Sequence, residues 1–510
     1  MKKSQATIYL FLIFLAGLAL RLIAVFHSQS FWFDEVVSLK IAEKSIIGSW
    51  QYLQWENNPP LHYWLLHFWI KLFGSSEPIL RLSSVLFSAL NILLFYLLGK
   101  KISGRHSVGL FAAFLSAFSC YHLFTSMDAR MYPLLLFFAL LACYFFWRYL
   151  TEGKNSFLIF YASCALGALY THLTAVFLLL SVNLYWLFAY YLLRRKNITW
   201  RAWLVANGAI LLLWLPWFYN FAKHSLARFN NGAWYLHTAG GGGFFLFELP
   251  RSFFFLGDEN PFLEFGALII LGIFFVWALA RFFFNQSAAG EIKIKYDPAP
   301  GSLFALFIFL VPLAIGFCFQ VWVSKYYLIG SAGLFLLLAL GFDRLRLKSL
   351  FVRIIIIVLF LLFAPYNLWI IKNQGQHQWQ TITSYIEANV RPGDSVFFPA
   401  FVYDIIVDHY RSKALPINHV LTRDLGDDQL LLAVKYNWYP VLNAEQLPDF
   451  NQVFETNQRI ILVYPGISAQ THRADLVLDW FLKHHWETVT QKEFGGFEKT
   501  TVFIFKNPAF

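Results

Sequence analysis

The chain has 510 residues, of which 58% are hydrophobic, 20% aromatic and only 14% charged, and its mean hydropathy is +0.54. These values exclude a soluble globular protein and predict a polytopic membrane protein. The net charge of +11 is unevenly distributed: residues 372–510 carry 12 Lys and Arg against 15 Asp and Glu, whereas residues 1–371 carry 28 against 14. The excess of basic residues is therefore confined to the apolar part of the chain. There it is typical of cytoplasmic loops beside anionic lipid, and it does not indicate a surface for nucleic acid.

Hydropathy predicts eleven transmembrane helices. The first, at 6–26, is read as a retained helix because it is long and no small-residue cleavage site follows it. The other ten are expected near 79–99, 107–126, 131–147, 157–171, 173–193, 202–221, 262–284, 302–322, 326–342 and 354–371.

Basic residues gather in alternate loops, which the positive-inside rule assigns to the cytoplasm. The N-terminus is then cytoplasmic, and the first loop at 27–78, the loop at 222–261 and the tail lie outside. All four cysteines fall within predicted spans, so neither a disulfide framework nor a cysteine zinc site is indicated.

The tail changes character and predicts two domains, a membrane domain at 1–371 and an extracytoplasmic α/β domain at 372–510. Helices are expected at 376–390, 402–411 and 472–485, strands at 395–399 and 459–464, and a hairpin turning at Gly495 and Gly496 within residues 493–506.

The first outer loop contains two short aromatic-rich segments, at 36–53 and 61–73, which predict helices lying in the membrane interface. Between them Pro59 and Pro60 predict a rigid turn that starts the second helix and holds His62 at a defined height. A satisfied interfacial histidine is an equally good interpretation of His62 alone.

An acidic pair, Asp34 and Glu35, follows directly after the first span. Carboxylates at a membrane surface are costly next to lipid and mark a site when they face a cavity. A solvated loop that merely begins with two acids is the plainer alternative.

Four motifs together resemble GT-C glycosyltransferases of the protein O-mannosyltransferase and lipid A aminoarabinose transferase type (glycosyltransferase family 39-like). They are the acidic pair, the Pro59-Pro60-Leu61-x-Tyr63-Trp64 segment, Glu77-Pro78 with Leu80-Arg81-Leu82-Ser83, and Asp128-Ala129-Arg130-Met131-Tyr132. The resemblance covers roughly residues 5–200, and Ser324-Lys325-Tyr326-Tyr327 is similar to a later family segment. Two departures are Lys325 in place of Arg, and Asn58 where some relatives carry Lys.

The resemblance implies inverting transfer of a sugar from a polyprenyl-phosphate donor to a protein, glycolipid or glycan acceptor on the outer face, in a bacterial plasma membrane. Such chemistry needs a base for the acceptor hydroxyl and positive charge for the departing phosphate. Asp34 is the expected base, with Glu35 and Asp128 as further catalytic candidates. The predicted substrate-binding residues are Asn58, His62, Arg81, Arg130, Tyr132, His172, Lys325 and Tyr326.

Several alternatives stay open at this point. Arg130 either binds phosphate or pairs with Asp128, Lys325 either binds phosphate or anchors the interface, and His172 either faces the site or hydrogen-bonds across the bundle. No motif with metal-ligand spacing is present, so no cofactor is expected to be required, although a divalent cation is compatible with the acids. A transporter and a non-catalytic scaffold that displays the tail are the competing functions.

Overall fold

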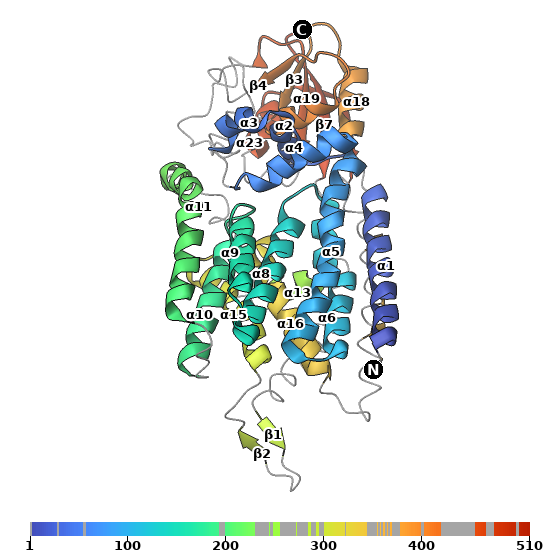
Figure 1. The fold of residues 1–510 in the computed structure, drawn as a ribbon. Coiled ribbons are helices and arrows are strands. Elements are labelled where there is room, and N and C mark those ends of the chain that lie inside the picture. The colour runs from blue at the N-terminus through green and yellow to red at the C-terminus, as the bar shows by residue number, and fades with distance from the viewer. Residues whose placement is uncertain are drawn as a thin grey trace. The chain divides into compact units, whose positions relative to one another are not determined.

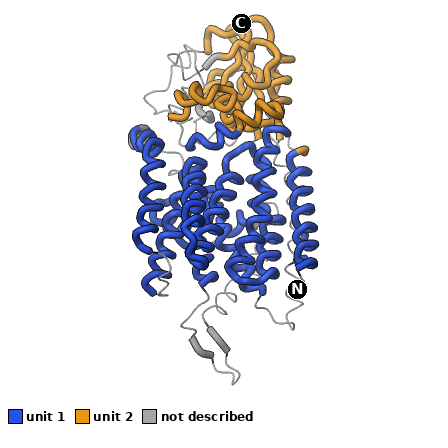
Figure 2. Tube along the Cα trace, viewed as in Figure 1, with its two compact units in different colours: residues 1–25, 57–65, 78–370 blue, residues 26–56, 66–77, 371–510 orange. Residues whose placement is uncertain are grey.

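The computed structural model describes most of residues 3–229 and 300–343, parts of the chain between 244 and 294 and between 354 and 369, and the tail from 378 except 399–401, 420–453, 466–473 and 496–498. The chain divides into two compact units, shown in Figure 2. Unit 1 comprises residues 1–25, 57–65 and 78–370, and unit 2 comprises residues 26–56, 66–77 and 371–510.

Unit 1 is built from long apolar helices that run alongside one another (Figure 1). Six helical stretches of the described residues are long and apolar enough to cross a membrane, or seven if one bent pair is a single span. They include α1 (Lys3–His27), α5 (Glu77–Ser103), α8 (Tyr132–Glu152), α11 (Trp200–Phe229), α15 (Pro300–Cys318) and the pair η2 (Ser324–Tyr327) with α16 (Leu328–Asp343). Two shorter apolar helices are α9 (Asn155–Leu169) and α10 (Ala175–Tyr191).

These helices confirm the polytopic helical class, and a turn separates α9 from α10 where two predicted spans nearly touch. The number eleven stays a prediction. Two of the predicted spans, at 262–284 and 354–371, lie largely outside the described residues. Unit 1 also contains α13 (Leu249–Phe254) and a small antiparallel pair, β1 (Phe284–Gln286) and β2 (Ile292–Ile294).

The span expected near 107–126 is not a single straight helix. The structure has α6 (His106–Phe118) and α7 (Cys120–Met127), which meet at an angle of 52°. Ser119 is extended at the break, and its hydroxyl accepts the N–H of His122, as an N-cap does. The fully buried Arg21 guanidinium donates to the carbonyls of Ser116 and Ala117, both at 3.0 Å. Arg21 thereby pairs the carbonyls that a helix end leaves without partners, which would be costly inside a membrane.

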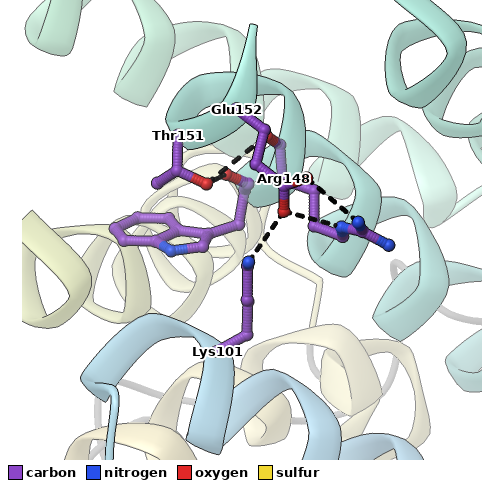
Figure 3. A network of polar contacts seen from close by, with 5 residues as sticks. Lys101, Arg148, Thr151 and Glu152 are labelled. Atoms are coloured by element: carbon purple, nitrogen blue, oxygen red, sulfur yellow. Dashed lines mark hydrogen bonds and ion pairs between the residues drawn. The ribbon is translucent and has the colours of Figure 1, made fainter. Parts of the chain in front are cut away.

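Ion pairs join the helix ends that carry basic residues. Figure 3 shows Lys101 of α5 and Arg148 of α8 both reaching the carboxylate of Glu152, with N···O distances of 2.8 to 3.0 Å. The arrangement links two spans at one end. It is partly exposed to solvent, so its contribution to stability is modest.

Unit 2 contains a five-stranded sheet in the order β4-β3-β5-β7-β6. The strands are β3 (Ser395–Phe398), β4 (Ile417–His419), β5 (Arg459–Pro465), β6 (Glu487–Phe494) and β7 (Thr500–Lys506). Strand β3 is parallel to β4 and β5, whereas β7 is antiparallel to β5 and β6. Helix α23 (Ala474–Lys483) packs Phe481 against Phe505 of the sheet, with ring centroids 4.6 Å apart.

The predicted helices of the tail are present as α18 (Trp379–Asn389), α19 (Val402–Tyr410) and α23, and the predicted hairpin is present as β6 and β7, although β6 begins six residues earlier than expected. Strand β4 was not predicted. Unit 2 also holds most of the first outer loop, with α2 (Phe33–Glu43), α3 (Ile46–Leu53) and the second half of α4 (Leu61–Phe73). These helices match the two expected aromatic-rich segments. The loop groups with the tail because α2 packs against α19.

Candidate functional site

The acidic pair lies in the first turn of α2, in unit 2. Glu35 is fully buried, and its Oε2 accepts the backbone N–H of Trp32 at 3.2 Å, forming the acid half of a capping box. Asp34 is half-buried, so it is more accessible than its neighbour. The two adjacent carboxylates therefore have different surroundings: Glu35 is buried and stabilises the helix start, whereas Asp34 is partly exposed.

Asp128 and Arg130 lie in unit 1, in the short bend between α7 and α8. The Arg130 N–H donates to the backbone carbonyl of Asp128 at 2.7 Å, and the Ser84 hydroxyl of α5 donates to the carbonyl of Arg130 at 3.2 Å. Arg130 is buried and Asp128 is half-buried. The bend is thus held by its own backbone and by α5, and it carries the buried Arg130 side chain.

The turn between α9 and α10 places His172 beside this bend. The ring of His172 lies 5.5 Å from the ring of Tyr132, the first residue of α8, and 5.5 Å from the ring of Tyr326 in η2. Its Nδ1 accepts the backbone N–H of Thr174 at 3.2 Å and lies 2.8 Å from the Thr174 hydroxyl. Because Nδ1 is an acceptor, the ring proton is on Nε2.

Lys325 of η2 lies close to the same aromatic residues. Its ammonium lies 5.8 Å from the centre of the Tyr132 ring, within the range of a cation–π contact. Three segments far apart in the chain therefore converge in unit 1, and we call the group they form the cationic–aromatic cluster: Arg130, Tyr132, His172, Lys325 and Tyr326.

The histidines near this cluster are neutral. Burial, followed by the charges of Arg130 and Lys325, lowers the pKa of His172 to about 3. Burial and Arg130 likewise lower the pKa of His62 to about 3, opposed by its hydrogen bond to the Ala129 carbonyl at 3.2 Å. His62 must donate in that bond, because a carbonyl only accepts. The positive charge of the cluster therefore comes from Arg130 and Lys325.

The remaining predicted residues occupy neighbouring segments of unit 1. Asn58 is half-buried ahead of the two prolines, and the Leu61 N–H that follows them donates to the Tyr170 carbonyl at 3.0 Å. Arg81 is 2% exposed on α5. The proline segment is therefore tied to the turn that carries His172.

The sequence analysis assigned no role to three residues that form hydrogen bonds between distant segments: His122, Glu77 and Tyr410. The ring nitrogens of His122 in α7 lie within hydrogen-bond distance of the hydroxyls of Ser116 and Ser331. A histidine within an apolar run could have indicated such a polar contact inside the helix bundle. Glu77 was noted within a motif but given no role, and Tyr410 carried no signal in the sequence. Among the described residues, no three potential ligands of the His, Cys, Asp and Glu types come together, and the expectation that no metal is required stays a prediction.

The fold is similar to that of solved GT-C glycosyltransferases. ArnT from Cupriavidus metallidurans in the apo state aligns with a TM-score of 0.60 and 14% identity, covering 98% of each chain, and the same enzyme bound to undecaprenyl phosphate aligns with a TM-score of 0.56 and 13% identity, again over 98% of each chain. The oligosaccharyltransferase AglB from Archaeoglobus fulgidus, in complex with an inhibitory peptide and a dolichol-phosphate, aligns with a TM-score of 0.54 and 14% identity over 92% of this chain and 70% of that one.

The sequence pattern of the dolichyl-phosphate-mannose-protein mannosyltransferase family matches residues 57–219, which include Asn58, His62, Asp128 and His172. No curated protein sequence matches the chain. The resemblance to GT-C enzymes of the O-mannosyltransferase and ArnT type is confirmed, and the chain is an integral membrane protein of this fold.

Proposed function

We propose that this protein is an inverting glycosyltransferase that moves a sugar from a polyprenyl-phosphate donor to an acceptor outside the membrane. The observation that carries the proposal is the cationic–aromatic cluster of unit 1. Two cations, Arg130 and Lys325, lie around neutral His172 where membrane helices end. One structural relative is bound to undecaprenyl phosphate and another to dolichol-phosphate, and these are ligands that such a cluster would suit.

Each group has one task in this mechanism. The acceptor hydroxyl oxygen attacks the anomeric carbon, and its proton passes to the Asp34 carboxylate. The bond between the anomeric carbon and the phosphate oxygen breaks, and the electron pair leaves with the phosphate. The phosphate gains negative charge as it departs, so Arg130 and Lys325 stabilise the transition state more than the ground state.

The other candidates have supporting tasks. Tyr132 and Tyr326 present aromatic faces that suit a sugar ring or the prenyl stem, while Asn58 and Arg81 supply polar contacts in the same unit. Asp128 remains a candidate for holding the acceptor. We also propose that the helices α2 to α4 and the C-terminal residues 372–510 lie on the outer side of a bacterial plasma membrane.

The decisive experiment uses purified full-length protein with a synthetic polyprenyl-phosphate sugar, and measures release of polyprenyl phosphate together with the glycosylated product. Mass spectrometry of envelope glycans and glycolipids, with and without the gene, identifies the sugar and the acceptor. We expect one glycoconjugate to disappear with the gene. Movement of substrate across vesicles without cleavage of the sugar–phosphate bond would instead support a transporter.

A further inference from the structure

Hydrogen bonds close the first turn of α2, which carries the acidic pair. The carbonyl of Trp32 accepts the N–H groups of Glu35 at 3.0 Å and Val36 at 3.1 Å, while Glu35 accepts the Trp32 N–H in return. The first turn is therefore tightly closed. Phe31 precedes this turn, and its backbone N–H is bonded to a side chain of another helix.

Tyr410, the last residue of α19, receives that N–H. The Phe31 amide donates to the Tyr410 hydroxyl oxygen at 2.6 Å, and the hydroxyl donates to Oε1 of Glu77 at 3.1 Å. A phenol has one proton to donate and lone pairs to accept, so both bonds form at once. All three residues belong to unit 2. Two hydrogen bonds in series therefore join the Glu77 carboxylate, the Tyr410 hydroxyl and the Phe31 amide, three residues before Asp34.

The groups around Tyr410 keep its hydroxyl protonated. Burial, together with the charges of Glu77 and Glu35, raises the pKa of Tyr410, so its hydroxyl keeps its proton and remains a donor. The neighbouring His409 packs its ring 5.7 Å from that of Phe31. At the other end of α2, Lys40 pairs with Asp408 at 3.2 Å. Helix α19 thus contacts the segment just before α2 and the last turn of α2.

We propose that Tyr410 is a positioning residue for Asp34, and that the C-terminal domain takes part in catalysis by holding the start of α2 through the Phe31 amide. This inference rests on the proposed function, since it takes Asp34 as the base. A general base must lie within hydrogen-bond reach of its proton, so a small displacement of the helix start lowers turnover more than it lowers binding.

The first test removes the hydroxyl alone. Tyr410→Phe should lower kcat about tenfold, with the KM for donor within about twofold, because one hydrogen bond that aligns the base is lost. Tyr385→Phe, which removes another hydroxyl of unit 2 from α18, should leave both constants at the parental values. Glu77→Gln keeps an acceptor for Tyr410 and should retain most activity, whereas Glu77→Leu should behave like Tyr410→Phe.

The second test does not depend on transfer activity. Hydrogen–deuterium exchange of the full-length protein reports on the amides of residues 31–36, and Tyr410→Phe should speed their exchange at least about threefold relative to the parent and to Tyr385→Phe. Parental exchange and parental kcat in Tyr410→Phe would overturn the positioning role. If Asp34→Asn keeps full activity while exchange still responds to Tyr410, the proposed mechanism fails and the structural link stands.

Discussion

Replacement of Asp34 by Asn separates catalysis from folding most cleanly. The side chain is half-buried at the first turn of α2, and Asn has the same shape, so no cavity forms. The cost to stability is the loss of a negative charge near a helix N-terminus, about 0.3–1 kcal/mol. Loss of the base should instead lower kcat by about 100- to 10,000-fold, which corresponds to roughly 3–5.5 kcal/mol in the activation barrier.

The assay is single-turnover release of polyprenyl phosphate by purified Asp34→Asn, with donor binding and thermal unfolding measured on the same preparation. The matched control is Glu35→Gln, in which the amide oxygen can still accept the Trp32 N–H, and we expect its kcat to fall about tenfold or less. Transfer by Asp34→Asn within threefold of the parent, with the protein folded, would refute the assignment of Asp34 as the base.

Three further predictions test the charges and the topology. Lys325→Ala should weaken donor binding about tenfold and also lower turnover, while Lys325→Arg should retain much of both because a guanidinium also binds phosphate; parental behaviour of Lys325→Ala would make this lysine only an interfacial anchor. Burial raises the pKa of Asp404 from 3.8 to about 7; the hydrogen bond from the Ile405 N–H opposes this shift, and the charge of Asp408 adds to it. Between pH 3.8 and 7 the folded state therefore holds a proton that unfolding releases. The stability of the C-terminal domain should therefore fall as the pH rises from about 4 to 7, by up to a few kcal/mol, and thermal unfolding of Asp404→Asn should lack this slope; equal slopes in both proteins would contradict the burial argument. A Val489→Cys variant made in a background without the native cysteines should react with an impermeant thiol reagent in intact cells, because Val489 is 50% exposed on β6 and the tail is predicted to lie outside; labelling only after permeabilisation would reverse the orientation.

Much of the molecule could be predicted from the sequence because the relevant signals are local. Hydropathy over about 20 residues reports whether a helix can cross a bilayer, and it predicted the spans α1, α5, α8, α15 and η2 with α16. The helix expected at 376–390 is present as α18, and the turn that follows it has Gly393 at φ +87°. The candidate residues Arg130, His172 and Lys325 were also chosen from the sequence, each because an ionisable side chain stood at the end of an apolar run.

The contacts between distant parts of the chain became known only from the tertiary structure. Hydropathy predicted a span near 107–126 and did not indicate the break at Ser119, because Arg21 and the two carbonyls it caps are about 95 positions apart and leave no mark on local hydropathy. Two neighbouring acids look equivalent in the sequence, and only packing shows that Glu35 is buried while Asp34 is accessible. The Phe31 amide meets the Tyr410 hydroxyl across 379 positions. A hydrogen bond of this kind depends on where folding places the donor and acceptor, so no local pattern in either segment could have indicated it.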